Sequence, residues 1–169
     1  LISSFHAPVI SAVHGAAAGA GMGLALAADL VVAGDGSRFV MAYTRSGLTP
    51  DGGTSWLLPR LVGLRRAMEL TLLNPILTAA EALDLRMISE VVPDTDVGAR
   101  ARALASQLAA GPTAAYVTAR RLMRESLQSG YAQQLSTEAT SIVASFDTED
   151  GLEGVRAFHE RRRPVFHGA

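Results

Sequence analysis

Residues 15–23 read GAAAGAGMG, and they stand between a β-branched segment and an alanine-rich apolar segment. The segment before them, Val9–Val13, is short and apolar, which predicts a buried strand. The segment after them, Met22–Ala28, has the length and composition of two helical turns. The glycines between the two segments predict a tight bend that carries the chain from the strand into the helix.

The rest of the chain extends this alternation and then becomes helical. Further strands are predicted at Leu30–Ala33, Arg38–Met41 and Met87–Val92. Apolar spacing and the breaks at glycine and proline predict helices over residues 55–62, 64–73, 97–110, 113–128, 132–146 and 148–160, with a shorter one after the capping box at 78–81. The predicted fold class is therefore α/β, with a core over residues 1–93 and a helical region over residues 94–169.

Composition excludes several function classes. The net charge is −1 and no basic patch carries interleaved aromatics, so we expect no nucleic-acid partner. The chain has no cysteine and its four histidines lack ligand spacing, so we expect no disulfide and no metal site. The longest apolar run, residues 16–33, is interrupted by glycines and Asp29, so we expect no membrane span. These features are typical of a cytoplasmic protein.

The glycine-rich stretch allows two functional interpretations. A dinucleotide-binding turn needs a small third residue for close packing of helix and strand, but the two possible alignments place Leu24 or Leu26 there. The alternative is an oxyanion site, in which the backbone N–H of Ala20 points from the helix start at a substrate carbonyl. Gly19 and Gly21 would let that carbonyl approach closely.

Asp51 is the only charged side chain in the loop Gly47-Leu-Thr-Pro-Asp-Gly-Gly-Thr54. It could form an Asx turn or cap the helix that follows. It could also be a general base, since desolvation by Met41, Leu48 and Trp56 would raise the pKa of a carboxyl group toward the useful range. We predict that Tyr43, Leu48 and Trp56 line an apolar or aromatic acyl pocket beside it.

The C-terminal stretch from Glu149 to Phe166 is rich in charge, and it ends in Arg161-Arg162-Arg163-Pro164. It is typical of a solvated helix with a frayed tail. It also suits a phosphate-binding patch next to an aromatic side chain, Phe158, that stacks on a nucleotide base. The residues alone leave both interpretations open.

Taken in order, these motifs resemble the crotonase (enoyl-CoA hydratase/isomerase) family. The landmarks are Pro8-Val-Ile-x-Ala-Val-x-Gly15, Gly19-Ala20-Gly21, Gly47-x-x-Pro50-x-Gly52-Gly53-Thr54, Leu58-Pro59-Arg60-x-x-Gly63 and Glu153-Gly154-x-x-Ala157-Phe158. The resemblance implies a spiral of β-β-α units, with its N-terminal part missing here, and a helical region that drives assembly into a homotrimer or homohexamer. It implies an acyl-CoA substrate without a further cofactor, an oxyanion donor at Ala20, and coenzyme A contacts from Phe158 and Arg161.

Two departures from the family pattern bear on the reaction. Hydratases of this family use two glutamates, and here those positions hold Gly23 and Tyr43. Adding water suits two carboxylates, whereas moving a double bond needs only one. Asp51 alone therefore favours an isomerase. The runs Phe39-Val-Met-Ala and Gly47-Leu-x-Pro-Asp51 also resemble the ring-1,2-epoxyphenylacetyl-CoA isomerases of phenylacetate breakdown. A nucleophilic Asp, as in the 4-chlorobenzoyl-CoA dehalogenase branch, and a hydratase stay open as alternatives.

The resemblance also implies that a family segment should precede Leu1, carrying the first strands and the second oxyanion donor. A non-catalytic truncated subunit is therefore a further alternative. With a complete site, the family implies a role in fatty acid or aromatic acid degradation.

Overall fold

The computed structural model describes residues 2–168, apart from the side chain of Ser3. It divides the chain into two compact units. The first holds residues 1–4 and 9–103, and the second holds residues 5–8 and 104–169. The chain passes from one unit to the other inside a long helix, ten residues after the boundary at Pro93 that the sequence suggested.

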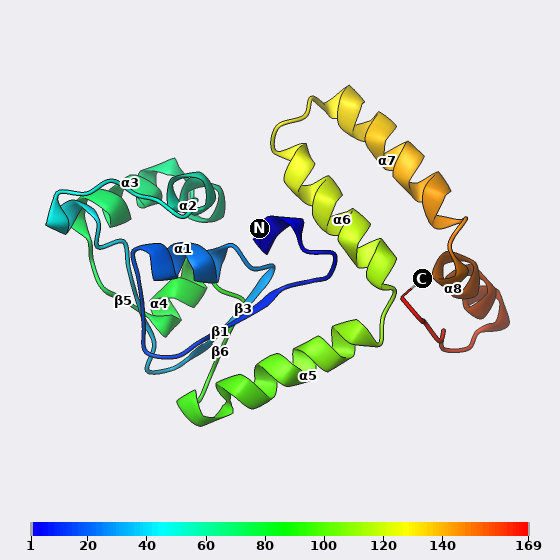
Figure 1. The fold of residues 1–169 in the computed structure, drawn as a ribbon, viewed down its shortest axis with the longest axis horizontal. Helices are drawn as coiled ribbons and strands as arrows, with labels where there is room; N and C mark the ends of the chain where they lie inside the picture. Colours follow the sequence, from blue (N-terminus) through cyan, green and yellow to red (C-terminus); the bar gives the residue numbers. More distant parts are fainter. Residues whose placement is uncertain (1, 169) are drawn as a thin grey trace. The chain divides into compact units, whose positions relative to one another are not determined.

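Two small sheets form the first unit (Figure 1). Their strands are β1 (Ile10–Val13), β2 (Ala16–Ala18), β3 (Leu30–Gly34), β4 (Arg38–Val40), β5 (Leu77–Thr78) and β6 (Glu90–Val92). One sheet has the parallel order β1-β3-β6, with Ile10 opposite Leu30. The other has the order β2-β4-β5, in which β2 and β4 are parallel and β5 is antiparallel. The predicted α/β class is confirmed.

Helices surround these sheets and make up the second unit. Those of the first unit are α1 (Ala20–Leu26), α2 (Thr54–Val62), α3 (Leu64–Leu73) and α4 (Ala79–Asp84). Then α5 (Val97–Ala109) leads into α6 (Thr113–Ser126), α7 (Tyr131–Ser145) and α8 (Glu149–Glu160). Short 3-10 turns occupy η1 (Ile2–Ser4), η2 (Thr44–Ser46) and η3 (Asp94–Asp96). Among the described residues, no helix is long and apolar enough to cross a membrane.

Local chemistry explains several helix ends. The capping box at Thr78 forms as predicted, because its hydroxyl accepts from the N–H of Glu81 while the Glu81 carboxylate accepts from the N–H of Thr78. Gly63 separates α2 from α3 with a φ of 76°, a backbone angle that glycine adopts without steric cost. The break predicted at Gly63 is therefore confirmed.

Several element boundaries differ from the prediction, and three of the differences have a clear physical reason. The helix predicted from Met22 begins at Ala20, because Gly19 supplies the turn by itself and Gly21 and Gly23 enter the helix. Residues 16–18 form strand β2 instead of a bend, since they pair with β4. The strand predicted from Met87 begins at Glu90, because the N–H of Met87 donates to the carbonyl of Ala82 at the end of α4.

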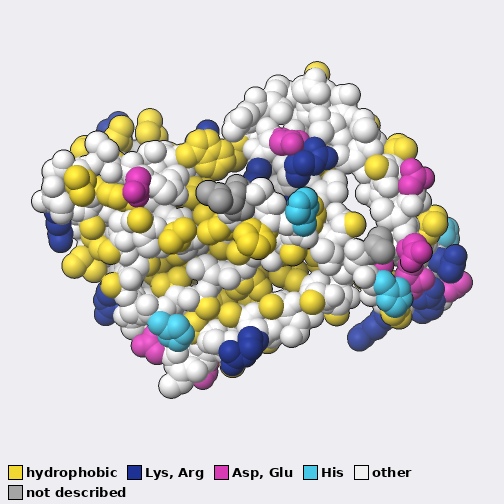
Figure 2. All heavy atoms as spheres, viewed as in Figure 1, with side chains coloured by type: hydrophobic (Ala, Val, Ile, Leu, Met, Phe, Trp, Pro, Cys, Tyr) yellow, Lys and Arg dark blue, Asp and Glu magenta, His cyan; other side chains and the backbone are white. Residues whose placement is uncertain are grey.

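The core of the first unit gathers apolar side chains from both sheets and from α1, α2, α3 and α4. Phe39, Met22, Met41 and Leu58 are its largest fully buried members. Burying an aromatic or aliphatic side chain of this size contributes about 1.5–3 kcal/mol each, so this cluster holds α1 and the loop before α2 against the sheets. Many other apolar side chains stay at the surface (Figure 2). On α3 and just after it these are Leu64, Met68, Leu72, Leu73 and Ile76.

Candidate active site

Asp51 lies in a loop whose backbone is fixed by its neighbours. Gly47, Gly52 and Gly53 all have positive φ angles, of 67°, 59° and 86°. The backbone N–H and the hydroxyl of Thr54 both donate to the carbonyl oxygen of Asp51, at 3.0 and 2.7 Å. The N-cap of α2 is Gly53, so the alternative in which the Asp51 carboxylate caps this helix is wrong. The carboxylate is left available for another partner.

That partner is Tyr43. Its hydroxyl donates to Oδ1 of Asp51 at 2.6 Å, and its side chain is buried, with 9% of the residue exposed. Burial, followed by the hydrogen bond to Asp51, raises the pKa of the Tyr43 phenol above its ordinary value. The phenol therefore keeps its proton at neutral pH and acts as a donor. The sequence predicted Tyr43 as a pocket-lining residue and did not predict this contact.

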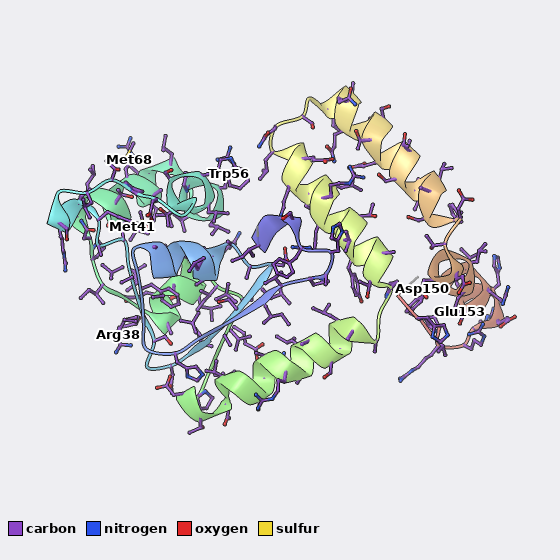
Figure 3. The ribbon with its side chains drawn as sticks, viewed as in Figure 1. Arg38, Met41, Trp56, Met68, Asp150 and Glu153 are labelled. Atoms are coloured by element: carbon purple, nitrogen blue, oxygen red, sulfur yellow. The ribbon has the colours of Figure 1, made fainter. Side chains whose placement is uncertain are left out.

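Desolvation of Asp51 was predicted wrongly. Asp51 is exposed in this chain. Met41 is turned into the core, and Leu48 is 62% exposed. Trp56 (Figure 3) is 37% exposed. The guanidinium of Arg60 lies over its ring, 4.0 Å from the ring centroid, in a cation–π contact. The three apolar side chains therefore do not enclose the carboxylate, and a hydrogen bond from Tyr43 orients it instead.

The start of α1 lies against the Asp51 loop. A Cβ placed on Gly52 would be 3.9 Å from the Cα of Ala20, so the residue after Asp51 touches the first residue of the helix. As the first residue of α1, Ala20 presents a backbone N–H that the helix itself does not bond. The structure thus brings together the two residues predicted to be catalytic, Asp51 and Ala20.

The glycines of the bend differ in the space around them. A Cβ on Gly19 would lie 3.6 Å from Cζ of Tyr43, so Gly19 packs over the ring that holds Asp51. A Cβ on Gly21 would meet nothing within 4 Å, which fits its predicted place beside a substrate. A Cβ on Gly23 would lie 2.9 Å from Cγ2 of Thr54 and 3.2 Å from the carbonyl oxygen of Gly52. Gly23 is therefore required for close packing of α1 against the loop.

A set of polar contacts holds the C-terminal tail onto α8, and sequence reasoning missed it. Glu153 accepts from Arg162 through both carboxylate oxygens and from the backbone N–H of Val165. These contacts lower the pKa of Glu153 to about 2, so it is ionised at neutral pH. Asp150 is 3% exposed and accepts from the N–H groups of His167 and Gly168, at 2.7 and 2.8 Å (Figure 3).

The two residues predicted to contact coenzyme A sit beside this set. Phe158 is 81% exposed on α8, and Arg161 ends the helix in a left-handed conformation with a φ of 54°. Arg162 is engaged by Glu153 and Glu160, the latter at 2.6 Å. Arg161 is exposed. Of these two neighbouring guanidinium groups, that of Arg162 is the one held by acidic side chains of α8.

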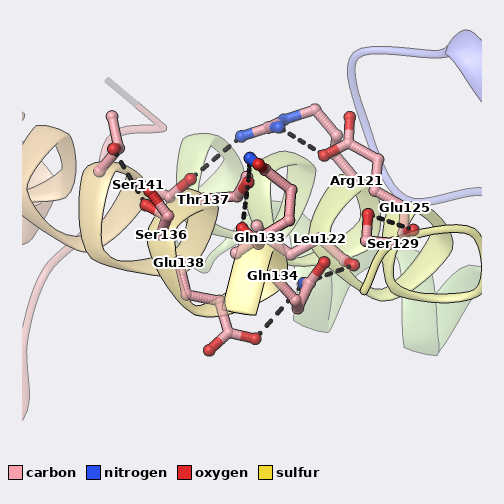
Figure 4. Close-up of polar contacts among 11 residues, drawn as sticks. Arg121, Leu122, Glu125, Ser129, Gln133, Gln134, Ser136, Thr137, Glu138 and Ser141 are labelled. Carbon is pink, nitrogen blue, oxygen red and sulfur yellow. Dashed lines mark hydrogen bonds and ion pairs between the residues drawn. The ribbon is translucent and has the colours of Figure 1, made fainter. Parts of the chain in front are cut away.

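A pocket of about 530 Å³ opens among α6, α7, α8 and the tail of the second unit. Apolar side chains such as Ile142, Val155 and Phe166 line most of it. The cation in its wall, Arg121, is already paired, because it donates to Glu125 at 2.8 Å and to Ser141 at 3.1 Å (Figure 4). Within residues 2–168, no group of His, Asp and Glu side chains is arranged to hold a metal ion.

Comparison with known proteins places the chain. The enoyl-CoA hydratase/isomerase family model matches residues 1–169. The chain is 45% identical to a Rhodobacter capsulatus protein named "probable enoyl-CoA hydratase" and 41% identical to the 1,2-epoxyphenylacetyl-CoA isomerase of Escherichia coli, covering 95% of the chain in each case. It spans 63% and 62% of those two relatives.

Solved structures agree with this assignment. The crystal structure of an enoyl-CoA hydratase from Polaromonas sp. JS666 superposes with a TM-score of 0.93 at 38% identity, and the match covers 98% of this chain and 65% of the other. The α/β fold predicted from the motifs, a crotonase-type fold with part of the family's length, is thereby confirmed. By sequence and by fold, the chain belongs to the enoyl-CoA hydratase/isomerase family.

Proposed function

We propose that this chain isomerises an acyl group carried as a coenzyme A thioester, with Asp51 as the group that moves the proton. The observation that carries the proposal is the exposed carboxylate of Asp51, which a buried tyrosine orients in a loop that lies against the start of α1. The relative from Escherichia coli, named as an isomerase of a coenzyme A thioester, supports this reaction class.

The chemistry follows from the positions of two groups. The thioester carbonyl would accept a hydrogen bond from the N–H of Ala20, which stabilises the negative charge that develops when a neighbouring carbon loses its proton. Asp51 would take that proton and return it to another carbon of the acyl group. No water is consumed, so a second acid/base carboxylate is not required.

Hydration is the second candidate, because the relative from Rhodobacter capsulatus is named as a probable hydratase. Two features disfavour hydration in this chain. At Gly23, where we expect one hydratase glutamate, a Cβ would lie 2.9 Å from Cγ2 of Thr54, so a side chain fits only if its neighbours shift. At Tyr43, where we expect the other, the phenol is already bonded to Asp51.

The two candidates differ in a rate ratio that can be measured directly. The complete protein is expected to convert a 3-enoyl-CoA or a ring-epoxide coenzyme A ester faster than it adds water to crotonyl-CoA. Both rates come from the same preparation by absorbance of the conjugated thioester and by chromatography of products. Faster hydration of crotonyl-CoA would reject isomerisation as the main activity.

The nucleotide end of the substrate belongs to the same proposal. If Phe158 and Arg161 contact coenzyme A, Arg161→Ala should weaken binding of an acyl-CoA roughly tenfold or more, since a charge-assisted contact to phosphate contributes about 1.5–3 kcal/mol. The melting temperature should hardly change. Arg65→Ala, which removes an exposed charge from α3, is the control. If isothermal titration gave the same acyl-CoA affinity for the wild type and Arg161→Ala, Arg161 would not contact the substrate and the end of α8 would be only a solvated surface.

Assembly and location complete the proposal. Apolar residues exposed on α7 and α8 would be covered in a homotrimer or homohexamer. They are Leu135, Ile142, Val143, Leu152 and Val155, and Phe146 is exposed directly after α7. A cytoplasmic place in fatty acid or aromatic acid degradation fits an enzyme that acts on coenzyme A esters.

A further inference from the structure

Backbone hydrogen bonds on both sides of Tyr43 fix the residue that contacts Asp51. The N–H of Tyr43 donates to the carbonyl of Met41 at 2.8 Å, across Ala42, which has a φ of 62°. This is a γ-turn of the strained kind, rare in proteins. On the other side, the carbonyl of Tyr43 accepts from the N–H groups of Ser46 and Leu48, at 2.9 and 3.0 Å.

The ring of Tyr43 is also packed in place. It packs against Gly19, where any side chain would approach Cζ of the ring, and the residue is buried. A non-glycine residue with positive φ costs on the order of 1–3 kcal/mol and persists only where the surroundings impose it. Here the strained residue is Ala42, directly before Tyr43, whose phenol donates to Oδ1 of Asp51.

From this geometry we propose that Tyr43 is a positioning residue for the reaction: it holds Oδ1 of Asp51 and so directs Oδ2 toward the substrate proton. The inference rests on the proposed function of Asp51. The main-chain carbonyl of Asp51 is fixed by Thr54, and the side chain is fixed by Tyr43, so both parts of the residue are oriented before substrate binds. The simpler interpretation is a buried tyrosine whose hydroxyl has merely found a polar partner.

Tyr43→Phe separates the two interpretations, because it removes the hydroxyl and keeps the ring. In the complete protein, kcat is expected to fall roughly ten- to hundredfold while KM for the acyl-CoA changes little. Tyr131→Phe, which alters an exposed tyrosine on α7, is the matched control and should change neither quantity.

A second measurement does not depend on turnover. With aspartate labelled by ¹³C at the side-chain carboxyl, the Asp51 signal is identified by its loss in Asp51→Asn, and its chemical shift at neutral pH is compared in wild-type and Tyr43→Phe protein. A chemical shift that changes in Tyr43→Phe, together with the fall in kcat, supports the inference, whereas an unchanged chemical shift or an unchanged kcat overturns it. If the chemical shift changes but Asp51→Asn keeps full activity, the proposed function fails and the Tyr43–Asp51 contact stands.

Discussion

Asp51→Asn is expected to remove almost all turnover of an acyl-CoA substrate. Asparagine keeps the shape of the side chain, and its amide oxygen can still accept from Tyr43, but it cannot take up a proton at neutral pH. A positioned general base accelerates a reaction about 10²–10⁴-fold, or on the order of 3–5 kcal/mol of barrier. The loss of kcat should therefore lie far above the noise of a spectrophotometric assay.

Binding gives the internal control for this variant. Affinity for the acyl-CoA should stay near that of the wild type, because the N–H of Ala20 and the contacts proposed for Phe158 and Arg161 are untouched. Asp84→Asn, at an exposed aspartate that ends α4, should leave both activity and binding unchanged. If Asp51→Asn retained most of its activity, the proton would be carried elsewhere and the Asp51 loop would be only a turn.

Features that depend only on neighbouring residues are predicted well from the sequence. The capping box at Thr78 and the break at Gly63 act within a few residues, so their outcome does not depend on the rest of the fold. The Asp51 loop was predictable for the same reason, since Gly52 and Gly53 adopt angles that favour glycine. The order of motifs then identified the family, which the family model confirms.

Contacts between distant residues could not be predicted in this way. Strand β2 is made of three alanines, and only its pairing with β4 makes it a strand. Glu153 and Arg162 are nine positions apart, a spacing that no helical repeat brings together, and the left-handed turn at Arg161 is what folds the tail back. The Tyr43–Asp51 hydrogen bond joins residues eight positions apart, and the positive φ at Ala42 beside it is one for which alanine gives no sequence signal.

Gly23, the position at which we expect a hydratase to carry one of its glutamates, is closely packed. It is buried in α1, and a Cβ there would meet Cγ2 of Thr54 at 2.9 Å. Thr54 cannot turn away freely, because its hydroxyl holds the carbonyl of Asp51 at 2.7 Å. Any side chain at position 23 must therefore move the loop that carries the proposed base.

Gly23→Glu is accordingly expected to destabilise the protein and not to create a hydratase. Overpacking alone costs about 1–3 kcal/mol, and a buried carboxylate without a partner adds to this cost. A total of roughly 3 kcal/mol would lower the melting temperature by about 10 °C in a chain of this size. Gly23→Ala should show the smaller, steric part of the loss, together with a lower kcat as Asp51 is displaced.

Gly21→Ala is the matched control, because the same methyl group in the same helix meets nothing within 4 Å. Its free energy of unfolding should rise by up to about 1 kcal/mol, since alanine loses less conformational freedom than glycine when it enters a helix. The opposite effects of two substitutions two residues apart would show that contact with Thr54, and not helix propensity, decides the result. A Gly23→Glu variant that melts like the wild type and hydrates crotonyl-CoA would mean that the Asp51 loop can move to make room for the side chain. Hydration would then be the better proposal for this fold.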